Sequence, residues 1–337
     1  MSKHYKHRVR GLREVAAFLA LVLTTGISVA LLVAVIVLRP GGQELGVTFS
    51  TQYARSLWMS PEEAFTAMVQ DLGVKRARIP VYWNDIEQAS GVWNFSEIDS
   101  LMAIAAEHDV EVTLAIGMKV PRWPECFIPS SLRGASEEVL NAAVYRYIQA
   151  MVAHAKQYSA LVRWQVENEA LFPYGNCPAP SLERLRKEID LVRALDSTHP
   201  VLLTVSGEQE PWLDMASMAD VVGVSMYRFA YNDVLGPVAF PYPPLYYRVH
   251  AMITRLFADD VIISELQMEP WFTGNPQEAW SVAIPFTEKD FVQHMEFVRQ
   301  TGIREAFLWG AEWWYYQKLH GDPSLWNVAK DVFFESR

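Results

Sequence analysis

The chain has few residues of the kinds that bind metals. Its 337 residues include only two cysteines, Cys126 and Cys177, and eight histidines. The cysteines lack the spacing of metal ligands, and the histidines are scattered without a His-x-x-x-His pair or a cluster with cysteine. The sequence therefore indicates no metal site, and we expect no metal or other cofactor.

A glycine-rich phosphate loop and an excess of positive charge are also missing. The first expected strand is followed by Ser50-Thr51-Gln52-Tyr53, whereas a dinucleotide-binding sheet needs glycines there. Residues 39–337 carry 24 Lys and Arg against 38 Asp and Glu, a net charge of −14. Such a surface repels phosphate backbones, so nucleic acid is a poor partner.

The N-terminal region contains one long apolar run. Residues 15–38 are 24 consecutive residues without a charge, enough for a helix to cross a hydrocarbon core about 30 Å thick. Residues 1–14 carry five Lys and Arg against one Glu. The positive-inside rule predicts a cytoplasmic tail over 1–14, a transmembrane signal anchor over 15–38, and a catalytic domain at 39–337 outside the cytoplasm. The sequence thus predicts a single-pass membrane protein.

The alternative is a cleaved signal peptide, because Ser28-Val29-Ala30 offers a small-x-small cleavage site. The apolar run continues unbroken through residues 31–38, beyond the 7–15 residues that a typical signal core needs. We therefore favour an uncleaved anchor.

Residues 39–337 alternate between short β-rich runs and helix-prone segments. Eight strands alternating with eight helices in about 300 residues predict one α/β domain, a (β/α)8 TIM barrel. A doubly wound open sheet is the alternative, and the missing phosphate loop disfavours it. The expected strands are Gly46–Ser50, Lys75–Pro80, Val110–Ile116, Leu161–Val166, Pro200–Val205, Asp220–Ser225, Val261–Ser264 and Glu305–Trp309. The expected helices lie near 61–72, 96–108, 136–158, 181–195, 208–218, 244–257 and 287–301 and after Asp322-Pro323.

Two glutamates stand where expected strands give way to loops. Glu169 follows the strand at 161–166, and Glu265 follows the strand at 261–264. In a parallel barrel the carboxyl ends of the strands meet at one mouth, where active sites are built. Two carboxylates across one cleft are the minimal equipment for cleaving a glycosidic bond. This pair predicts a glycosidase.

Further residues of suitable chemistry are expected at the same mouth. These are Arg78, Asn168, Tyr227 and Trp309. Together with Glu169 and Glu265, the set resembles the clan of retaining glycoside hydrolases with (β/α)8 barrels, clan A, which includes cellulases, β-mannanases, β-galactosidases and β-xylosidases. The resemblance covers residues 39–337, and its strongest element is Asn-Glu after the fourth strand with a second Glu after the seventh.

Other segments agree with this resemblance or depart from it. Residues 78–87, followed by 91–95 and Asp99, look like the second strand and loop of the clan. Cellulase-type members commonly carry a His after the third strand, where this chain has Gly117-Met118-Lys119. They also carry His-x-Tyr after the sixth, where this chain has Ser225-Met226-Tyr227. These departures leave the clan in place but not the cellulase family.

The resemblance implies different roles for the two glutamates. Glu169 is expected to be the general acid/base, and its pKa must then be raised so that it holds a proton near neutral pH. Glu265 is expected to be the nucleophile of a double displacement, kept ionised by Arg78 and Tyr227. The alternative for Arg78 alone is a structural ion pair.

The other site residues are expected to bind the sugar. Asn168 is expected to bond the 2-hydroxyl, and Trp309 to supply the floor on which the reacting sugar rests. Trp83 and Trp123 fall in or beside loops at the mouth, where aromatic rings suit sugar stacking, although such rings also pack cores. Glu312 is expected either to bond sugar hydroxyls or to be a solvated loop acid.

The leading prediction is thus a membrane-anchored enzyme that hydrolyses an oligo- or polysaccharide, with a β-linked glycan favoured. A transglycosidase with the same glutamates and a catalytically inactive glycan-binding barrel are alternatives. A lyase or aldolase needs an activated lysine or a metal cluster, and only Lys119 lies near that face.

The two cysteines are expected to form a disulfide. An extracytoplasmic domain faces an oxidising compartment, where paired cysteines usually become bridges. Cys126 lies in the loop after the third expected strand and Cys177 in the loop after the fourth, and these loops rise side by side in a barrel. The alternative is two free, buried thiols.

Overall fold

The computed structural model describes residues 15–29, 42–232, 235–273 and 281–336. They fall into two units, Met1–Pro40 and Gly41–Arg337. In the first unit, residues 15–29 form a helix whose side chains are exposed. Residues 30–38 of the predicted anchor lie outside the described residues. Over the described part of the chain, no helix is both long and apolar enough to cross a membrane.

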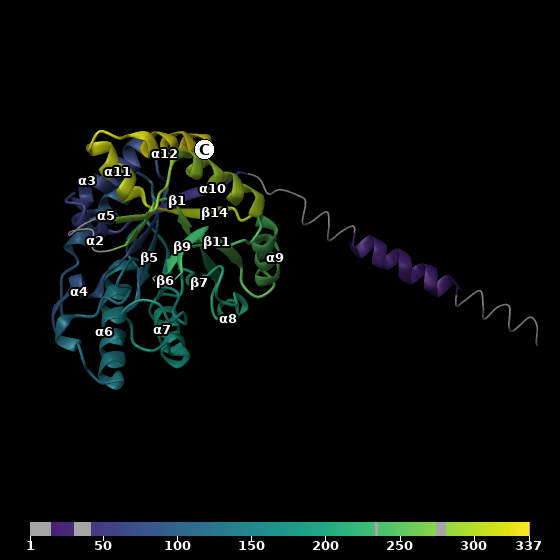
Figure 1. Ribbon diagram of the computed structural model, residues 1–337. Coiled ribbons are helices and arrows are strands. Elements are labelled where there is room, and N and C mark those ends of the chain that lie inside the picture. Colours follow the sequence, from purple (N-terminus) through teal and green to yellow (C-terminus); the bar gives the residue numbers. More distant parts are fainter. Residues whose placement is uncertain (1–14, 30–41, 233–234, 274–280, 337) are drawn as a thin grey trace, which may run out of the picture. The chain divides into compact units, whose positions relative to one another are not determined.

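The second unit is a closed barrel of parallel strands with helices around it (Figure 1). The strand order around the barrel is β1-β14-β11-β8-β7-β6-β5-β2. Each barrel strand therefore pairs with the barrel strands that come before and after it along the chain. The predicted (β/α)8 fold is confirmed. The barrel strands are β1 Glu44–Thr48, β2 Arg76–Pro80, β5 Glu111–Ile116, β6 Leu161–Val166, β7 Val201–Ser206, β8 Val221–Met226, β11 Asp260–Gln267 and β14 Glu305–Trp309.

The principal helices follow the expected segments, except for the helix Ala311–Leu319 (α11), which was not expected. Helix α3 begins after a serine cap: the Ser60 hydroxyl accepts a hydrogen bond from the backbone N–H of Glu63, and Pro61 occupies the first turn. Thr287 and Asp290 form a capping box before α10. The longer helices are α3 Pro61–Ala67, α5 Ser96–Glu107, α6 Glu137–Ala155, α7 Leu182–Leu195, α9 Pro244–Thr254, α10 Glu288–Thr301, α11 Ala311–Leu319 and α12 Ser324–Glu335.

Several short elements were not expected from the sequence. A π-helical turn, Met68–Leu72, continues α3, and the helix predicted at 208–218 is only α8, Leu213–Ala216. Short helices α2 Thr51–Ser56 and α4 Trp83–Ile86 follow β1 and β2. Antiparallel ribbons form in the loops, pairing β3 Glu87–Ala89 with β4 Val92–Trp93, β9 Phe229–Asn232 with β10 Gly236–Ala239, and β12 Trp271–Thr273 with β13 Ser281–Ile284.

Strand β11 differs from the prediction in a way that matters for the site. It extends to Gln267, so Glu265 lies within the strand and not after it. The pairing register with β8 shifts between Ile263 and Glu265, which marks a bulge or irregularity. A bulge redirects the side chains beside it. The position of Glu265 therefore depends on this irregularity as well as on the strand.

The core explains where polar groups are tolerated. Strands and helices bury a large apolar cluster, and four strand residues (Leu202, Val221, Ile262 and Phe307) form a separate one. Polar side chains nevertheless lie buried near the carboxyl ends of the strands, among them Arg78, Gln165, Thr204 and Glu265. Buried polar groups are costly unless they bond one another, so this layer indicates a site rather than simple packing.

Candidate active site

Arg78 lies at the centre of the buried polar layer. It comes from β2 and its side chain is inaccessible to solvent. Nη1 donates to Oε1 of Glu265 at 3.0 Å, and Nη2 donates to Oδ1 of Asn168 at 2.7 Å. Nε donates to Oε1 of Gln165 at 2.6 Å. One guanidinium therefore joins β2, the end of β6 and β11, which a purely local ion pair would not do.

Both oxygens of Glu265 accept hydrogen bonds. Oε1 faces Arg78, and Oε2 accepts from the Tyr227 hydroxyl at 2.9 Å. Burial and the charge of Glu265 raise the pKa of Tyr227 well above its usual value, so this phenol keeps its proton and donates. Donation by a guanidinium and a phenol stabilises the carboxylate anion. The structure thus brings Arg78, Tyr227 and Glu265 together.

Glu169 lies in a different environment. It is buried beyond the last residue of β6, and its backbone N–H donates to Oγ1 of Thr204 at 2.8 Å. Burial, and then the negative charge of Glu265, raise the pKa of Glu169 to about 8. A carboxyl group of this kind holds its proton at neutral pH. General acid catalysis requires a group that keeps its proton in this way.

Asn168 is held in one orientation between these groups. Its Oδ1 accepts from Arg78, from Nε2 of Gln165 at 3.2 Å and from Oγ1 of Thr204 at 3.2 Å. A guanidinium only donates, so the oxygen of the amide must face Arg78. The Nδ2 of Asn168 then donates to Oε2 of Glu125 at 3.2 Å.

Trp309 is mostly buried, and a cation covers its ring. The guanidinium carbon of Arg122 lies 4.1 Å from the centroid of Trp309 and 3.8 Å from that of Tyr53. Arg122 also pairs with Glu269 at 2.5 Å and Glu312 at 3.3 Å. A sugar could therefore stack directly on Trp309 only on the opposite face of the ring, or after Arg122 had moved.

Glu312 is not a solvated loop acid. Its side chain is completely buried, and Oε1 accepts from the backbone N–H of Ser50 at 2.5 Å. Burial raises its pKa to about 7, although the charge of Arg122 opposes the change. Glu312 therefore anchors Arg122 to the loop after β1. Both of its oxygens are engaged by the protein, which leaves little for the sugar hydroxyls that it was predicted to bond.

The two predicted tryptophans in nearby loops differ in accessibility. Trp83 is fully buried, where Nε1 donates to Oε2 of Glu87 at 2.6 Å and the ring stacks on Tyr147. A side chain without exposed surface offers none to a substrate, so the expected contact is corrected: Trp83 packs beneath the β2 loop. Trp123 is 63% exposed and lies edge-on to Tyr174, which leaves a ring face available to a sugar.

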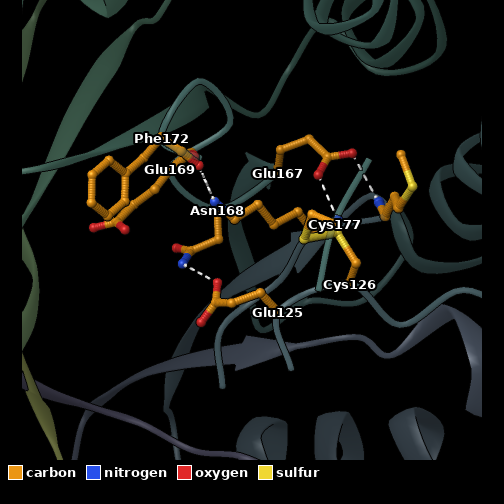
Figure 2. The surroundings of a disulfide bond; sticks show 9 residues. Glu125, Cys126, Glu167, Asn168, Glu169, Phe172 and Cys177 are labelled. Atoms are coloured by element: carbon orange, nitrogen blue, oxygen red, sulfur yellow. Dashed lines mark hydrogen bonds between the residues drawn. A yellow bond between two sulfur atoms is a disulfide. The ribbon is translucent and has the colours of Figure 1, made fainter. Parts of the chain in front are cut away.

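The disulfide between Cys126 and Cys177 is confirmed, with a Cα–Cα distance of 5.2 Å. Figure 2 shows it beside Glu125 and Glu167, and it joins the loops that follow β5 and β6. Glu167 accepts hydrogen bonds from the backbone N–H groups of Met118 and Lys119 at 2.8 and 2.6 Å. Its carboxyl group joins the same two loops.

Lys119 has a structural position rather than that of an activated amine. Its Nζ donates to the backbone carbonyls of Glu169 and Phe172 at 2.9 and 2.8 Å. An amine engaged by two carbonyls is poorly placed to attack a substrate. The lyase or aldolase alternative therefore loses the lysine that the sequence offered for it.

Sequence reasoning missed Glu125 and Arg122. Both lie in the loop after β5 and have positive φ, 73° for Glu125 and 89° for Arg122. Their closeness in sequence to Cys126 is the only local feature that could have indicated them. Arg122 meets residues from β1, β11 and β14 loops, and such long-range contacts leave no pattern in the sequence.

Comparison with known proteins agrees with this geometry. The model of Glycosyl hydrolase family 10 matches residues 49–189, which include Arg78, Asn168 and Glu169 but not Glu265. No curated protein matches the chain.

Solved structures with the same barrel are similar at low sequence identity. A β-galactosidase from the haloarchaeon Halorubrum lacusprofundi has a TM-score of 0.57 at 14% identity, over 87% of this chain and 58% of that one. A GH5_18 protein from Bifidobacterium longum subsp. infantis has 0.58 at 14%, over 88% and 80%. An endo-β-1,4-mannanase from Thermotoga petrophila has 0.59 at 12%, over 88% and 77%. The chain thus spans little more than half of the galactosidase. With the barrel fold, the family match supports a glycosidase.

Proposed function

We propose that the protein cleaves a β-linked glycan by a retaining double displacement, with Glu169 as general acid/base and Glu265 as nucleophile. The observation that carries the proposal is the contrast between the two carboxyl groups. Glu265 accepts from Arg78 and Tyr227, whereas the pKa of Glu169 is raised to about 8. A retaining glycosidase needs one ionised carboxylate and one protonated carboxyl group at the same bond.

The proposed reaction proceeds in two steps. Glu169 gives its proton to the glycosidic oxygen while a carboxylate oxygen of Glu265 attacks the anomeric carbon, which forms a glycosyl ester and releases the alcohol. Glu169, now ionised, takes a proton from water as that water attacks the anomeric carbon and releases Glu265. Arg78 and Tyr227 hold Glu265 throughout, and Asn168 bonds the 2-hydroxyl of the sugar.

A screen of the full-length protein against chromogenic β-glycosides and polysaccharides tests the proposal. We expect hydrolysis with retention at the anomeric carbon, read by proton NMR of the first product formed. Products longer than the substrate would indicate transglycosylation by the same residues. Binding of a glycan without turnover would instead favour the inactive barrel. Hydrolysis that survives unchanged in both Glu169→Gln and Glu265→Gln would contradict the assignment.

We also propose that the barrel acts outside the cytoplasm and is tethered by residues 15–38. The disulfide suits an oxidising compartment, and the charge-free run follows a basic segment. Membrane fractionation and protease added to intact cells test this proposal. A soluble product that begins at Leu31 would show that Ser28-Val29-Ala30 is a cleavage site.

A further inference from the structure

Glu125 places a third carboxyl group in the candidate active site. It is 7% exposed, and it lies near enough to Glu265 and Glu169 for their charges to affect its titration. In Figure 2 one oxygen of Glu125 faces Asn168 and the other points away from it. The reaction described above assigns this group no task.

The partner of Glu125 locates it relative to the substrate. Asn168 Nδ2 donates to Oε2 of Glu125 at 3.2 Å, and Arg78 fixes the opposite side of the same amide. In the proposed reaction Asn168 meets the substituent at C2 of the sugar. A group bonded to the Nδ2 side of that amide therefore lies next to the same substituent.

Contacts with the neighbouring loop hold Glu125 in a strained backbone conformation. Its φ of 73° is a left-handed conformation, which costs an ordinary residue on the order of 1 kcal/mol or more and persists only where the surroundings enforce it. Gly175 packs so closely that a Cβ there would lie 2.6 Å from the Cβ of Glu125. The backbone N–H of Asn176 donates to the carbonyl of Pro124 at 3.0 Å, and the next residue, Cys126, is bonded to Cys177.

The surroundings also decide which form of the side chain is present. Burial, followed by the charges of Glu265 and Glu169, raises the pKa of Glu125 well above its usual value. An uncharged carboxyl group can accept from Asn168 with one oxygen and donate from the other. A carboxylate could only accept.

We propose that Glu125 contacts the substrate and, together with Asn168, recognises a hydroxyl group at C2 of the sugar whose bond is cleaved. Glu125 does so as an uncharged acid that accepts from Asn168 and donates to the sugar oxygen. The inference rests on the proposed function, because it takes the position of the sugar from the roles of Glu169 and Glu265. It narrows the substrates to glycosides with a free hydroxyl at C2.

The test compares two substrates in three forms of the full-length protein. The substrates are the best chromogenic β-glycoside from the screen and its 2-deoxy counterpart, used with wild type, Glu125→Ala and Glu125→Gln. We expect Glu125→Ala to lower kcat/KM on the C2-hydroxyl substrate by on the order of 10–100-fold, and on the 2-deoxy substrate by less than about 3-fold. The ratio between substrates removes their different intrinsic reactivities.

Glu125→Gln is the decisive variant. An amide keeps one acceptor for Asn168 and one donor for the sugar, so we expect kcat/KM within about 3-fold of wild type on both substrates. The exposed Glu138→Gln in the first turn of α6 serves as the matched control. If Glu125→Ala does not fold, Glu125→Met replaces it, since it fills similar space without a polar group.

Four results would overturn the inference. Equal losses on both substrates would give Glu125 only a structural role, and a loss in Glu125→Gln as large as in Glu125→Ala would show that its charge is needed. If Glu125→Ala kept the wild-type kcat/KM on both substrates, this inference alone would be wrong. A wild type that cleaves no glycoside would remove the proposed function as well.

Discussion

The ends of β6 and β11 each present a glutamate to the same site but prepare it differently. At β6 the strand ends at Val166, and the chain then turns through Glu167 and Glu169, whose φ values are 58° and 44°. At β11 the strand continues past Glu265, and its pairing register with β8 shifts between Ile263 and Glu265. One carboxyl group is held by a strained loop and the other by a sheet.

The electrostatic surroundings follow the same division. Glu265 faces two donors, Arg78 in β2 and Tyr227 directly after β8. Glu169 is buried beside the charge of Glu265, and its pKa rises to about 8. The free energy of ionisation of Glu169 is therefore set by its neighbours and not by its residue type.

Replacing each glutamate separately is the strongest way to break this comparison. We expect Glu265→Gln to lower kcat by on the order of 10⁴-fold or more on every glycoside, because the proposed reaction forms its glycosyl ester on this carboxylate. Glu169→Gln should cost on the order of 10²–10⁴-fold on poor leaving groups and far less on a dinitrophenyl glycoside, which needs no acid. Steady-state kinetics on both substrates decide this. Equal sensitivity of the two variants to the leaving group would contradict the separate roles.

Removing a donor from the β11 side sharpens the comparison. Tyr227→Phe deletes the hydroxyl that donates to Glu265 at 2.9 Å while keeping the ring. We expect kcat to fall by roughly 10²-fold, as for the loss of one preorganised donor at a reacting carboxylate. Tyr145→Phe, on α6, is a matched control, because Tyr145 is only partly buried and does not belong to the site. An unchanged kcat in Tyr227→Phe would show that Arg78 alone suffices.

The pH profile tests the β6 side. A raised pKa means that Glu169 is protonated below about pH 8 and loses its proton as pH rises through that value. Activity that needs the acid form should therefore be retained up to about pH 8 and fall about tenfold for each further unit. In Glu169→Gln, measured on the same poor-leaving-group substrate as wild type, this alkaline limb should disappear. An alkaline fall in activity that persists in Glu169→Gln would be caused by the titration of another group.

Removing the disulfide is the mildest test. Cys126→Ala with Cys177→Ala opens a link across 51 residues, and we expect the free energy of unfolding to fall by about 2–4 kcal/mol. Denaturant unfolding measures this change. Activity should fall only severalfold, because hydrogen bonds from the Met118 and Lys119 amides to Glu167 still join the two loops. A larger loss of activity than of stability would show that the disulfide itself positions the site.

The strand ends show how far sequence reasoning reached. The strands at 161–166 and 305–309 were predicted with their observed bounds, and Arg78, Asn168, Tyr227 and Glu265 meet as expected. Alternation of apolar runs and helical segments is a local signal, and parallel strands must bring their carboxyl ends together. Burial of Trp83 was not predictable, since an aromatic residue after a strand suits a cleft and a core equally.

The amino-acid sequence by itself determined the barrel, the two acids at its mouth and the disulfide, because each follows from periodicity or from the order of neighbouring loops. Only the tertiary structure decided that Glu125 joins the site and that Arg122 covers Trp309. It also decided that Glu169 keeps its proton. These features depend on burial and on charges from residues far apart in the chain, and the electrostatic free energy between such groups is set by distances that only folding creates.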